Sequence, residues 1–460
     1  MTKDTTICAI ATAPGGAIGI IRVSGKDAVS IADSIFSPFG TGHSLSDRKP
    51  YTIAFGNIVG EDGNVIDEVL VSVFRSPHSY TGEDSVEISC HGSAYILQQT
   101  ISLLIRKGCC MAEPGEFTQR AFLNGKIDLS QAEAVADLIS STNRATHDMA
   151  LSQLKGHFSN ELSTLRSQLL KITSLLELEL DFSDHEELEF ANRDQLQRLA
   201  VHIKKHITSL ISSFDTGNAL RQGICVAIVG NTNVGKSTLL NRLVGEDKSI
   251  VSDIHGTTRD YIEGAVVLEG VLFRFVDTAG IRQTCDVVES IGIERTYQKI
   301  SEARIVIWIV DSVPSDDEIK EMKERVKGKK LIVVYNKIDQ AEHCKSCETL
   351  NSIATGHVGI SAKCGTNITA LIQLIVESAN IPQLSESDVV VTSARHYNAL
   401  TRAAESIQNV IDGMNIGLSS DIIAEDLRAT IDSLADITGE GRISSQETLN
   451  NIFRNFCVGK

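Results

Sequence analysis

Apolar residues in the first part of the chain alternate with the period of β-strands. Short β-branched runs, separated by glycine, proline and serine, occupy residues 1 to about 120, and such runs are typical of strands joined by turns. The order of strands and helices predicts an α+β domain with a mainly antiparallel sheet. We predict strands over residues 6–12, 18–25, 51–59, 68–74 and 85–90, and helices over 26–36 and 93–106.

Later segments carry the apolar period of helices. Leucine and isoleucine recur at three- and four-residue steps over residues 162–176 and 196–210, and again over 400–411 and 427–434. Each stretch predicts one apolar face of a helix, and together they predict a helical bundle. A capping-box pattern formed by Ser130 and Glu133 predicts that a helix starts there.

A phosphate-loop motif lies between these helical segments. Residues 230–237 fit G-x-x-x-x-G-K-[ST], after a strand-like stretch and before a helical one, which is the context the motif needs. Backbone amides and the positive end of the helix would bind the phosphates. Lys236 would reach the β- and γ-phosphates of GTP, and Ser237 would bind Mg²⁺. The residues expected along this loop are Asn233, Val234, Gly235, Lys236, Ser237 and Thr238.

Further elements predict that the nucleotide carries guanine. Asn336, Lys337 and Asp339 follow a strand-like run, and the Asp339 carboxylate can accept hydrogen bonds from N1–H and the 2-amino group of guanine. Adenine has neither donor, so the site would reject it. Ser361, Ala362 and Lys363 would supply a backbone N–H to the guanine carbonyl oxygen. A D-x-x-G element near Mg²⁺ and the γ-phosphate comprises Asp277, Thr278, Ala279 and Gly280.

The residue after this D-x-x-G element narrows the class of GTPase that the motifs predict. Ile281 stands where Ras-type enzymes carry the glutamine that orients water. Thr257 and Thr258 lie in a switch-like segment that would bind Mg²⁺ through a threonine. Asn233 adds a neutral oxygen suited to a monovalent cation. Glu289 is a candidate to position water, and a solvated surface carboxylate is the alternative.

Composition limits the other possibilities. The chain has 460 residues, a net charge of −16 and 42% hydrophobic residues, so we expect several domains and no broad basic surface for nucleic acid. No apolar run is as long as a membrane span, and the first residues lack a signal-peptide core. We therefore expect a cytoplasmic protein. The 10 cysteines are scattered, which suits reduced thiols.

Several isolated features have two interpretations. His91 follows a strand and is either a catalytic base or a hydrogen-bonded structural residue. The acidic segment 181–187 is a metal site or, as we favour, a solvated loop. Cys344 and Cys347 form a C-x-x-C without a second pair, which argues against zinc.

The chain resembles the tRNA modification GTPase family MnmE, also called TrmE, from end to end. Beyond the nucleotide motifs, the resemblance rests on specific sequence blocks at residues 19–25, 79–84, 90–92, 114–126, 128–134, 437–440 and 457–460. It implies an N-terminal folate-binding and dimerisation domain at 1–120. It also implies a helical domain at 121–215 and 381–460, with a Ras-like P-loop GTPase domain inserted at 216–380.

The resemblance also implies an activity. It implies a K⁺-stimulated GTP hydrolase that works with the FAD-containing flavoprotein MnmG (GidA). The pair would add an aminomethyl or carboxymethylaminomethyl group to carbon 5 of the wobble uridine of certain tRNAs. The one-carbon unit would come from 5-formyl- or methylene-tetrahydrofolate. The chain would form a homodimer and, with MnmG, a heterotetramer.

Site residues follow from the same resemblance. Folate would contact Arg22, Glu87, Lys126 and Lys460, with Cys457 close by as a candidate catalytic residue. Thr258 would join Ser237 on Mg²⁺, and Glu289 would orient water through a bridging water. K⁺ would take the place of an arginine finger. Its ligands would be Asn233, Ser252, Ile254 and Thr257.

The alternative is a ribosome-assembly or regulatory GTPase that switches a partner without modification chemistry. Such proteins share the nucleotide motifs and the apolar residue at Ile281, but they lack the N-terminal blocks and the terminal segment 457–460.

Overall fold

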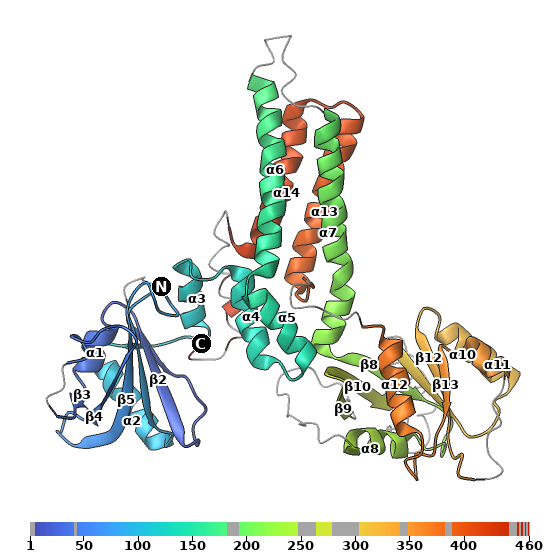
Figure 1. The fold of residues 1–460 in the computed structure, drawn as a ribbon, viewed down its shortest axis with the longest axis horizontal. Helices are drawn as coiled ribbons and strands as arrows, with labels where there is room; N and C mark the ends of the chain where they lie inside the picture. Colours follow the sequence, from blue (N-terminus) through green and yellow to red (C-terminus); the bar gives the residue numbers. More distant parts are fainter. Residues whose placement is uncertain are drawn as a thin grey trace, which may run out of the picture. The chain divides into compact units, whose positions relative to one another are not determined.

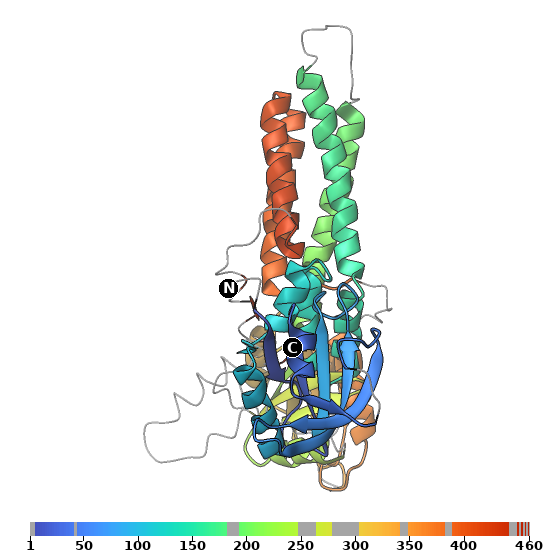
Figure 2. The same cartoon turned by 90° about the vertical axis from the view of Figure 1, so that its left-hand side faces the viewer.

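The computed structural model describes most of the chain, which folds into two compact units (Figures 1 and 2). The first unit comprises residues 1–139, 153–203 and 402–460, and the second comprises 140–152 and 204–401. The domain boundaries expected near residues 120, 215 and 380 stay predictions. The described residues are 5–40, 44–181, 193–246, 264–277, 303–340, 348–381 and 389–440, with 449, 452, 453, 456 and 459.

A seven-stranded sheet, drawn in blue in Figure 1, forms the N-terminal part, with strand order β3-β4-β5-β6-β2-β1-β7. Neighbouring strands are antiparallel except for the parallel pair β1 and β7. The α+β prediction is confirmed, and β3, β7 and α3 are additions to it. The strands are β1 (Ile7–Ile10), β2 (Ile18–Ser24), β3 (Phe36–Pro38), β4 (Thr52–Val59), β5 (Val65–Phe74), β6 (Ser85–His91) and β7 (Cys110–Met111); the helices are α1 (Ala28–Asp33), α2 (Ala94–Arg106) and α3 (Glu116–Leu123).

The two faces of this sheet are covered differently. Strand β5 buries Val69, Val71 and Val73, and these side chains share one apolar core with residues of α1 and α2. At the β1 side of the opposite face, Ile7 packs with Phe117 of α3. Alternation along the strands therefore assigns one face to α1 and α2, and no helix in the described part of the chain covers the whole of the other face.

Long helices follow the sheet. The apolar positions predicted over 162–176 are buried along α6, which packs along α14 (Figures 1 and 2). No helix of the described chain is both long and apolar enough to cross a membrane. The helices are α4 (Leu129–Ser140), α5 (Arg144–Leu154), α6 (His157–Asp181), α7 (Arg193–Gln222), α13 (Ala394–Asn415) and α14 (Ser420–Thr438).

The predicted capping box at the start of α4 is wrong by two residues. The Asp128 N–H donates to Gln131 Oε1 at 3.0 Å, and the Gln131 N–H donates to Asp128 Oδ1 at 2.9 Å. Aspartate caps a helix as well as serine does, and a glutamine three residues later completes the box. Ser130 is buried instead, and its hydroxyl accepts a hydrogen bond from Gln153 at 3.0 Å.

A second sheet has six strands in the order β13-β12-β11-β8-β10-β9. All pairs are parallel except β9 with β10, as expected of a doubly wound Ras-like domain. Its strands are β8 (Ile224–Val229), β9 (Gly264–Leu268), β10 (Val271–Asp277), β11 (Ile305–Val310), β12 (Lys330–Tyr335) and β13 (Gly356–Gly359); its helices are α8 (Lys236–Glu246), α10 (Asp316–Arg325), α11 (Glu348–Ile353) and α12 (Ile368–Ala379).

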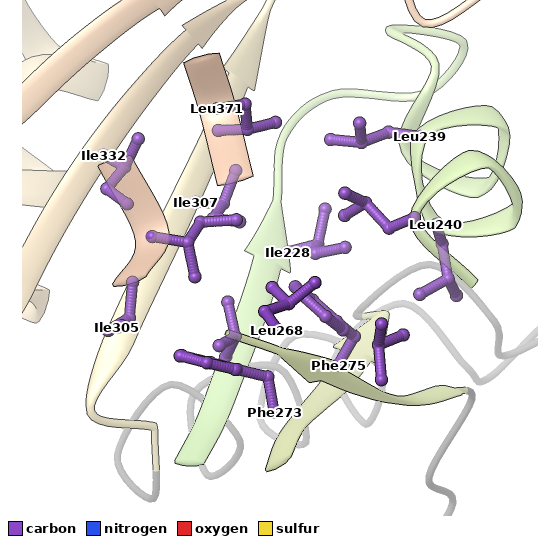
Figure 3. Close-up of a cluster of buried hydrophobic side chains, with 14 of the residues drawn as sticks. Ile228, Leu239, Leu240, Leu268, Phe273, Phe275, Ile305, Ile307, Ile332 and Leu371 are labelled. Carbon is purple, nitrogen blue, oxygen red and sulfur yellow. The ribbon is translucent and has the colours of Figure 1, made fainter. Parts of the chain in front are cut away.

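The apolar core of this second sheet fixes the two elements that flank the phosphate loop. Ile228 and Ile307 on the central strands pack with Leu239 and Leu240 of α8 and with Leu371 of α12 (Figure 3). These side chains are almost completely buried. Apolar packing on both sides of the loop fixes the end of β8 and the start of α8, between which the loop runs.

Candidate functional site

The phosphate loop begins at a backbone position that favours glycine. Gly230 has φ +151°, and a Cβ there would collide with the carbonyl oxygen of Ile309 on the neighbouring strand β11. Asn233 lies in the left-handed region at φ 63°, where asparagine is better tolerated than most residues. The loop can therefore fold tightly over the end of the sheet, as the motif predicts.

Lys236 is held inside this loop. Its side chain is buried, and Nζ donates to the carbonyl oxygens of Gly230 and Asn231 at 2.7 Å each. Ser237 and Thr238 follow in the first turn of α8 and are exposed. An ammonium group beside a helix N-terminus fits an anionic ligand such as a phosphate.

Asn336 joins the phosphate loop to the loop expected to bind guanine. Its side-chain amide donates to the Val234 carbonyl at 2.7 Å, and its oxygen accepts from the Ala362 N–H at 3.0 Å. Gly235 leaves the space that the Asn336 amide occupies, since a Cβ there would collide with Nδ2. The fold thus brings together three segments of the predicted site that are far apart in the sequence.

The other predicted guanine residues lie beside Asn336. The Ser361 hydroxyl, by hydrogen bonding to the Asp339 carboxyl, holds the pKa of that group below its usual range. Asp339 therefore stays ionised and can accept two hydrogen bonds from guanine. Lys337, at φ 65°, pairs at 2.6 Å with Asp311, the residue directly after β11. Sequence reasoning missed Asp311, which no motif marks.

Part of the predicted site lies outside the described residues. Asp277 ends β10 beside Ile228 of β8, which places its backbone near the phosphate loop; its side chain is not described. The predicted residues outside the described ones are Ser252, Ile254, Thr257, Thr258, Thr278, Ala279, Gly280, Ile281, Glu289, Cys457 and Lys460, together with Cys344 and Cys347.

A second group of charged and aromatic side chains lies on the N-terminal sheet. Arg22 and Glu87 are paired across β2 and β6, with Nη2 2.7 Å from Oε1. The guanidinium lies 5.6 Å from the ring centroid of Tyr80 and 5.7 Å from that of Phe117. Burial raises the pKa of the Tyr80 hydroxyl. The structure therefore brings together two residues that the family resemblance assigned to one site.

The end of the chain packs against the same group. Arg22 Nη1 donates to the carbonyl oxygen of Gly459 at 3.3 Å. Gly459 has φ +93°, and a Cβ there would lie 2.6 Å from the Ile10 carbonyl oxygen of β1. Phe453 and Phe456 pack with Leu129 of α4. Gly459 therefore lies against β1 and β2, next to the Arg22–Glu87 pair.

The side chain of Lys126 makes its hydrogen bond away from the Arg22–Glu87 pair. Its Nζ donates to the Pro77 carbonyl at 3.0 Å and is exposed, while its Cγ would lie 3.2 Å from a Cβ on Gly82. The hydrogen bonds described for Arg22 go to Glu87 and Gly459, and that of Lys126 goes to Pro77. The structure does place Lys126 against the loop that carries Tyr80.

A buried ion network supports that loop, and sequence reasoning missed it. Arg120 of α3 lies 2.8 Å from Glu116 and 3.2 Å from Glu83, and its side chain is only 10% exposed. It also donates to the Thr5 carbonyl at 2.8 Å. Arg120 lies inside the sequence block 114–126, so the signal was present, but nothing in the sequence identified its partners.

His91 is bound to a buried carboxylate. Its Nδ1 lies 2.7 Å from Asp67 Oδ1, and its backbone N–H donates to Oδ2 at 2.8 Å. This supports the hydrogen-bonded structural interpretation. Among the described residues, no group of three or more His, Cys, Asp or Glu side chains could hold a metal ion. The acidic segment 181–187 lies almost wholly outside them.

The phosphate loop, the loop expected to bind guanine and the doubly wound sheet together define a P-loop GTPase domain. The comparisons with known proteins give the family. The MnmE helical domain matches residues 129–457, and the GTP-binding protein TrmE N-terminus matches residues 6–126. The chain belongs to the MnmE family of tRNA modification GTPases.

Curated relatives match over their full length. The tRNA modification GTPase MnmE of Phocaeicola vulgatus is 53% identical, with all of both chains covered. That of Parabacteroides distasonis is 54% identical over 99% of this chain and 100% of the relative. Among solved structures, Aquifex aeolicus Era bound to GDP and AlF4⁻ is 29% identical, with a TM-score of 0.25, over 40% of this chain and 66% of that one.

Proposed function

We propose that this chain hydrolyses GTP and that hydrolysis serves the modification of the wobble uridine of certain tRNAs. The observation that carries the proposal is the presence in one chain of two sites of different chemistry. One is the guanine-nucleotide site around Lys236 and Asn336; the other is the Arg22–Glu87 pair with the terminal segment beside it. A GTPase that only switches a partner has no need of the second site.

The nucleotide site is proposed to use two cations. Mg²⁺ would be held by Ser237 in the first turn of α8 and by Thr258. K⁺ would be held by Asn233 with Ser252, Ile254 and Thr257. Asn233 supports this by its place at the tip of the loop, exposed and in the left-handed conformation. A neutral amide oxygen suits a monovalent cation, whose charge would assist phosphoryl transfer as an arginine finger does.

Salt dependence tests this part of the proposal. GTP hydrolysis should be faster in K⁺ than in Na⁺, and Asn233→Ala should remove the difference while GDP still binds. Glu289→Ala should lower the rate without loss of nucleotide affinity, since Glu289 is proposed to orient water. Equal rates in the two salts would count against Asn233 as a ligand.

The N-terminal site is proposed to bind a tetrahydrofolate carrying a one-carbon unit, either 5-formyl or methylene. A folate offers carboxylates, ring N–H donors and a flat ring. Arg22 supplies a cation, Glu87 an acceptor and Tyr80 an aromatic ring within 5.6 Å of the guanidinium. Lys126 and Lys460 would add positive charge for the glutamate tail, and Cys457 would lie close to the one-carbon unit.

A homodimer is proposed through the face of the N-terminal sheet that α1 and α2 leave uncovered. Phe39 and Phe55 stack there with ring centroids 4.7 Å apart, yet Phe55 is 51% exposed and Ile53 of the same strand 63%. Leu70, paired with Phe55 across β4 and β5, is 47% exposed. A contiguous apolar patch of this kind marks a protein–protein interface.

The tRNA and the flavoprotein MnmG complete the proposal. A chain with a net charge of −16 has little electrostatic attraction for nucleic acid by itself. We therefore propose that tRNA is bound together with MnmG, whose FAD supplies the redox chemistry, in a heterotetramer.

The test is mass spectrometry of tRNA nucleosides from cells that lack this protein. The 5-substituted wobble uridine should disappear and return with the wild-type gene. It should not return with a variant that lacks Lys460, or with Asp339→Ala. Unchanged nucleosides would contradict the proposal, and ribosome profiles would then test the assembly-factor alternative.

A further inference from the structure

The guanine loop, residues 361–365, is fastened to α8 by Arg242, a residue outside all the motifs above. Arg242 Nη2 donates to the carbonyl oxygen of Lys363 at 3.2 Å. Gly365 leaves room for the guanidinium, since a Cβ there would lie 2.8 Å from Nη2 and 3.2 Å from Cζ. Gly365 also has φ +79°, so both its backbone and its missing side chain suit this contact.

Internal hydrogen bonds make the guanine loop a rigid unit. The Gly365 N–H donates to the Ser361 carbonyl at 2.8 Å, and the Cys364 N–H donates to the Ser361 hydroxyl at 3.1 Å. A loop closed in this way moves as a whole. Its place is then set by its tethers to the rest of the domain.

Two tethers attach this unit to the phosphate-binding elements. Asn336 accepts a hydrogen bond from the Ala362 N–H, and Arg242 donates one to the Lys363 carbonyl oxygen. Asn336 is bonded to the phosphate loop and Arg242 belongs to α8, the helix that begins with Lys236. With the Arg242 tether removed, the loop could still turn about the Asn336 contact. Hydrogen-bond strength falls steeply with angle and distance, so such a turn would weaken the contact to the guanine oxygen.

We propose that Arg242 is a positioning residue for base recognition. It keeps the Ala362 N–H aligned with the 6-oxygen of guanine and ties that alignment to the helix that begins at the phosphates. This inference rests on the proposed GTP function and adds to it a specificity role for α8. Asp339, which reads N1 and the 2-amino group, belongs to the segment after β12 and bonds to this loop only at its first residue, Ser361, two positions from the Lys363 contact, so it should be affected less.

Binding of three nucleotides distinguishes a positioning role of Arg242 from a general role in stabilising the fold. GDP has the 6-oxygen, its 6-thio analogue replaces it with sulfur, a weak acceptor, and inosine diphosphate lacks only the 2-amino group. Affinities would be measured by calorimetry on the full chain for the wild type, Arg242→Met and Arg242→Lys. Lys320→Met, on the exposed surface of α10, is the matched control because it also removes one positive charge from this domain.

Arg242→Met should weaken GDP binding about fivefold to tenfold, as expected for one partly exposed charge-assisted hydrogen bond. The ratio of GDP to 6-thio-GDP affinity should fall toward one, while the ratio of GDP to inosine diphosphate affinity stays within about twofold of wild type. Arg242→Lys should recover part of the discrimination, and Lys320→Met should match wild type.

Other outcomes would overturn the inference. An equal loss of affinity for all three nucleotides would assign Arg242 a structural role only. An unchanged GDP affinity would show that Arg242 has no role in nucleotide binding. A wild-type chain that binds no guanine nucleotide would overturn the proposed function as well. The two failures are therefore distinguishable by the wild-type measurement alone.

Discussion

Replacing Asn336 with alanine should disconnect the guanine loop from the phosphate loop. The side chain is 3% exposed and makes two hydrogen bonds, one to the Val234 carbonyl and one from the Ala362 N–H. Alanine can make neither. Both backbone groups would then be left without their present partner inside the domain.

The size of the effect follows from these two bonds. A buried polar group that loses its partner costs about 1–3 kcal/mol, so two of them cost about 2–6 kcal/mol. Water entering the space left by the amide would place the result near the lower end. If about half of this cost, about 1–3 kcal/mol, appears in binding, the affinity for GDP should fall at least about fivefold, since about 1.4 kcal/mol corresponds to a factor of 10.

Calorimetric titration of GDP into the full chain is the appropriate assay. A chain with two compact units does not have to unfold in one transition, so a single unfolding free energy is a poor measure. Asn241→Ala, on the exposed side of α8, controls for the loss of an asparagine. A GDP affinity within twofold of wild type would refute the reasoning that Asn336 joins the two loops.

Three further predictions concern other parts of the chain. Arg120→Met leaves two nearly buried carboxylates without their cation; it should destabilise the N-terminal domain by about 3–5 kcal/mol, measured by amide hydrogen exchange of its strands. Gly459→Ala should push the terminal segment off β1, because its Cβ would lie 2.6 Å from a backbone oxygen. Wobble-uridine modification should then fall while GTP hydrolysis in K⁺ stays within twofold. Finally, the pKa of Asp339 is lowered by the Ser361 hydroxyl; its contribution should be fully present above the ordinary Asp pKa of about 3.9 and be lost only as pH falls through the lowered value. GDP affinity should show no loss from this carboxylate between pH 8 and about 5, and when the titration is carried on to about pH 3 the loss in Ser361→Ala should begin at a higher pH than in wild type.

Each of these has a result that would contradict it. Unchanged exchange protection in Arg120→Met would mean that the ion network is not needed for stability. Normal modification by Gly459→Ala would separate the terminal segment from the chemistry. An acid-induced loss that begins at the same pH with and without Ser361 would assign the lowered pKa of Asp339 to another cause.

The nucleotide site could be predicted from the sequence because its chemistry is local. A phosphate loop needs glycines and a lysine at fixed spacing, and guanine recognition needs an asparagine directly before Lys337 and an aspartate two positions after it. These requirements apply to any strand–loop–helix unit. Alternating and helical periods likewise predicted β4, β5 and α6, whose buried positions fall on one face each.

Long-range partners could not be predicted in the same way. Arg120 meets Glu83, 37 residues away, and Arg242 meets Lys363, 121 residues away. Neither pair has a spacing rule, because the contact depends on how two separately folded segments pack. Sequence reasoning missed the cap at Asp128 for a different reason: two capping patterns overlap there, and aspartate with glutamine forms the box.

The contact between Arg22 and Gly459 has a consequence for how the protein is made. The two residues are 437 positions apart in the sequence, so the β-sheet that carries Arg22 leaves the ribosome long before its last neighbour exists. At roughly 5–20 residues per second, synthesis from Lys126 to Gly459 takes about 20–60 s. During that interval the N-terminal domain can fold with its charged pair in place but without the terminal segment beside it. A product interrupted late in translation would therefore carry a complete nucleotide domain and an unfinished N-terminal site.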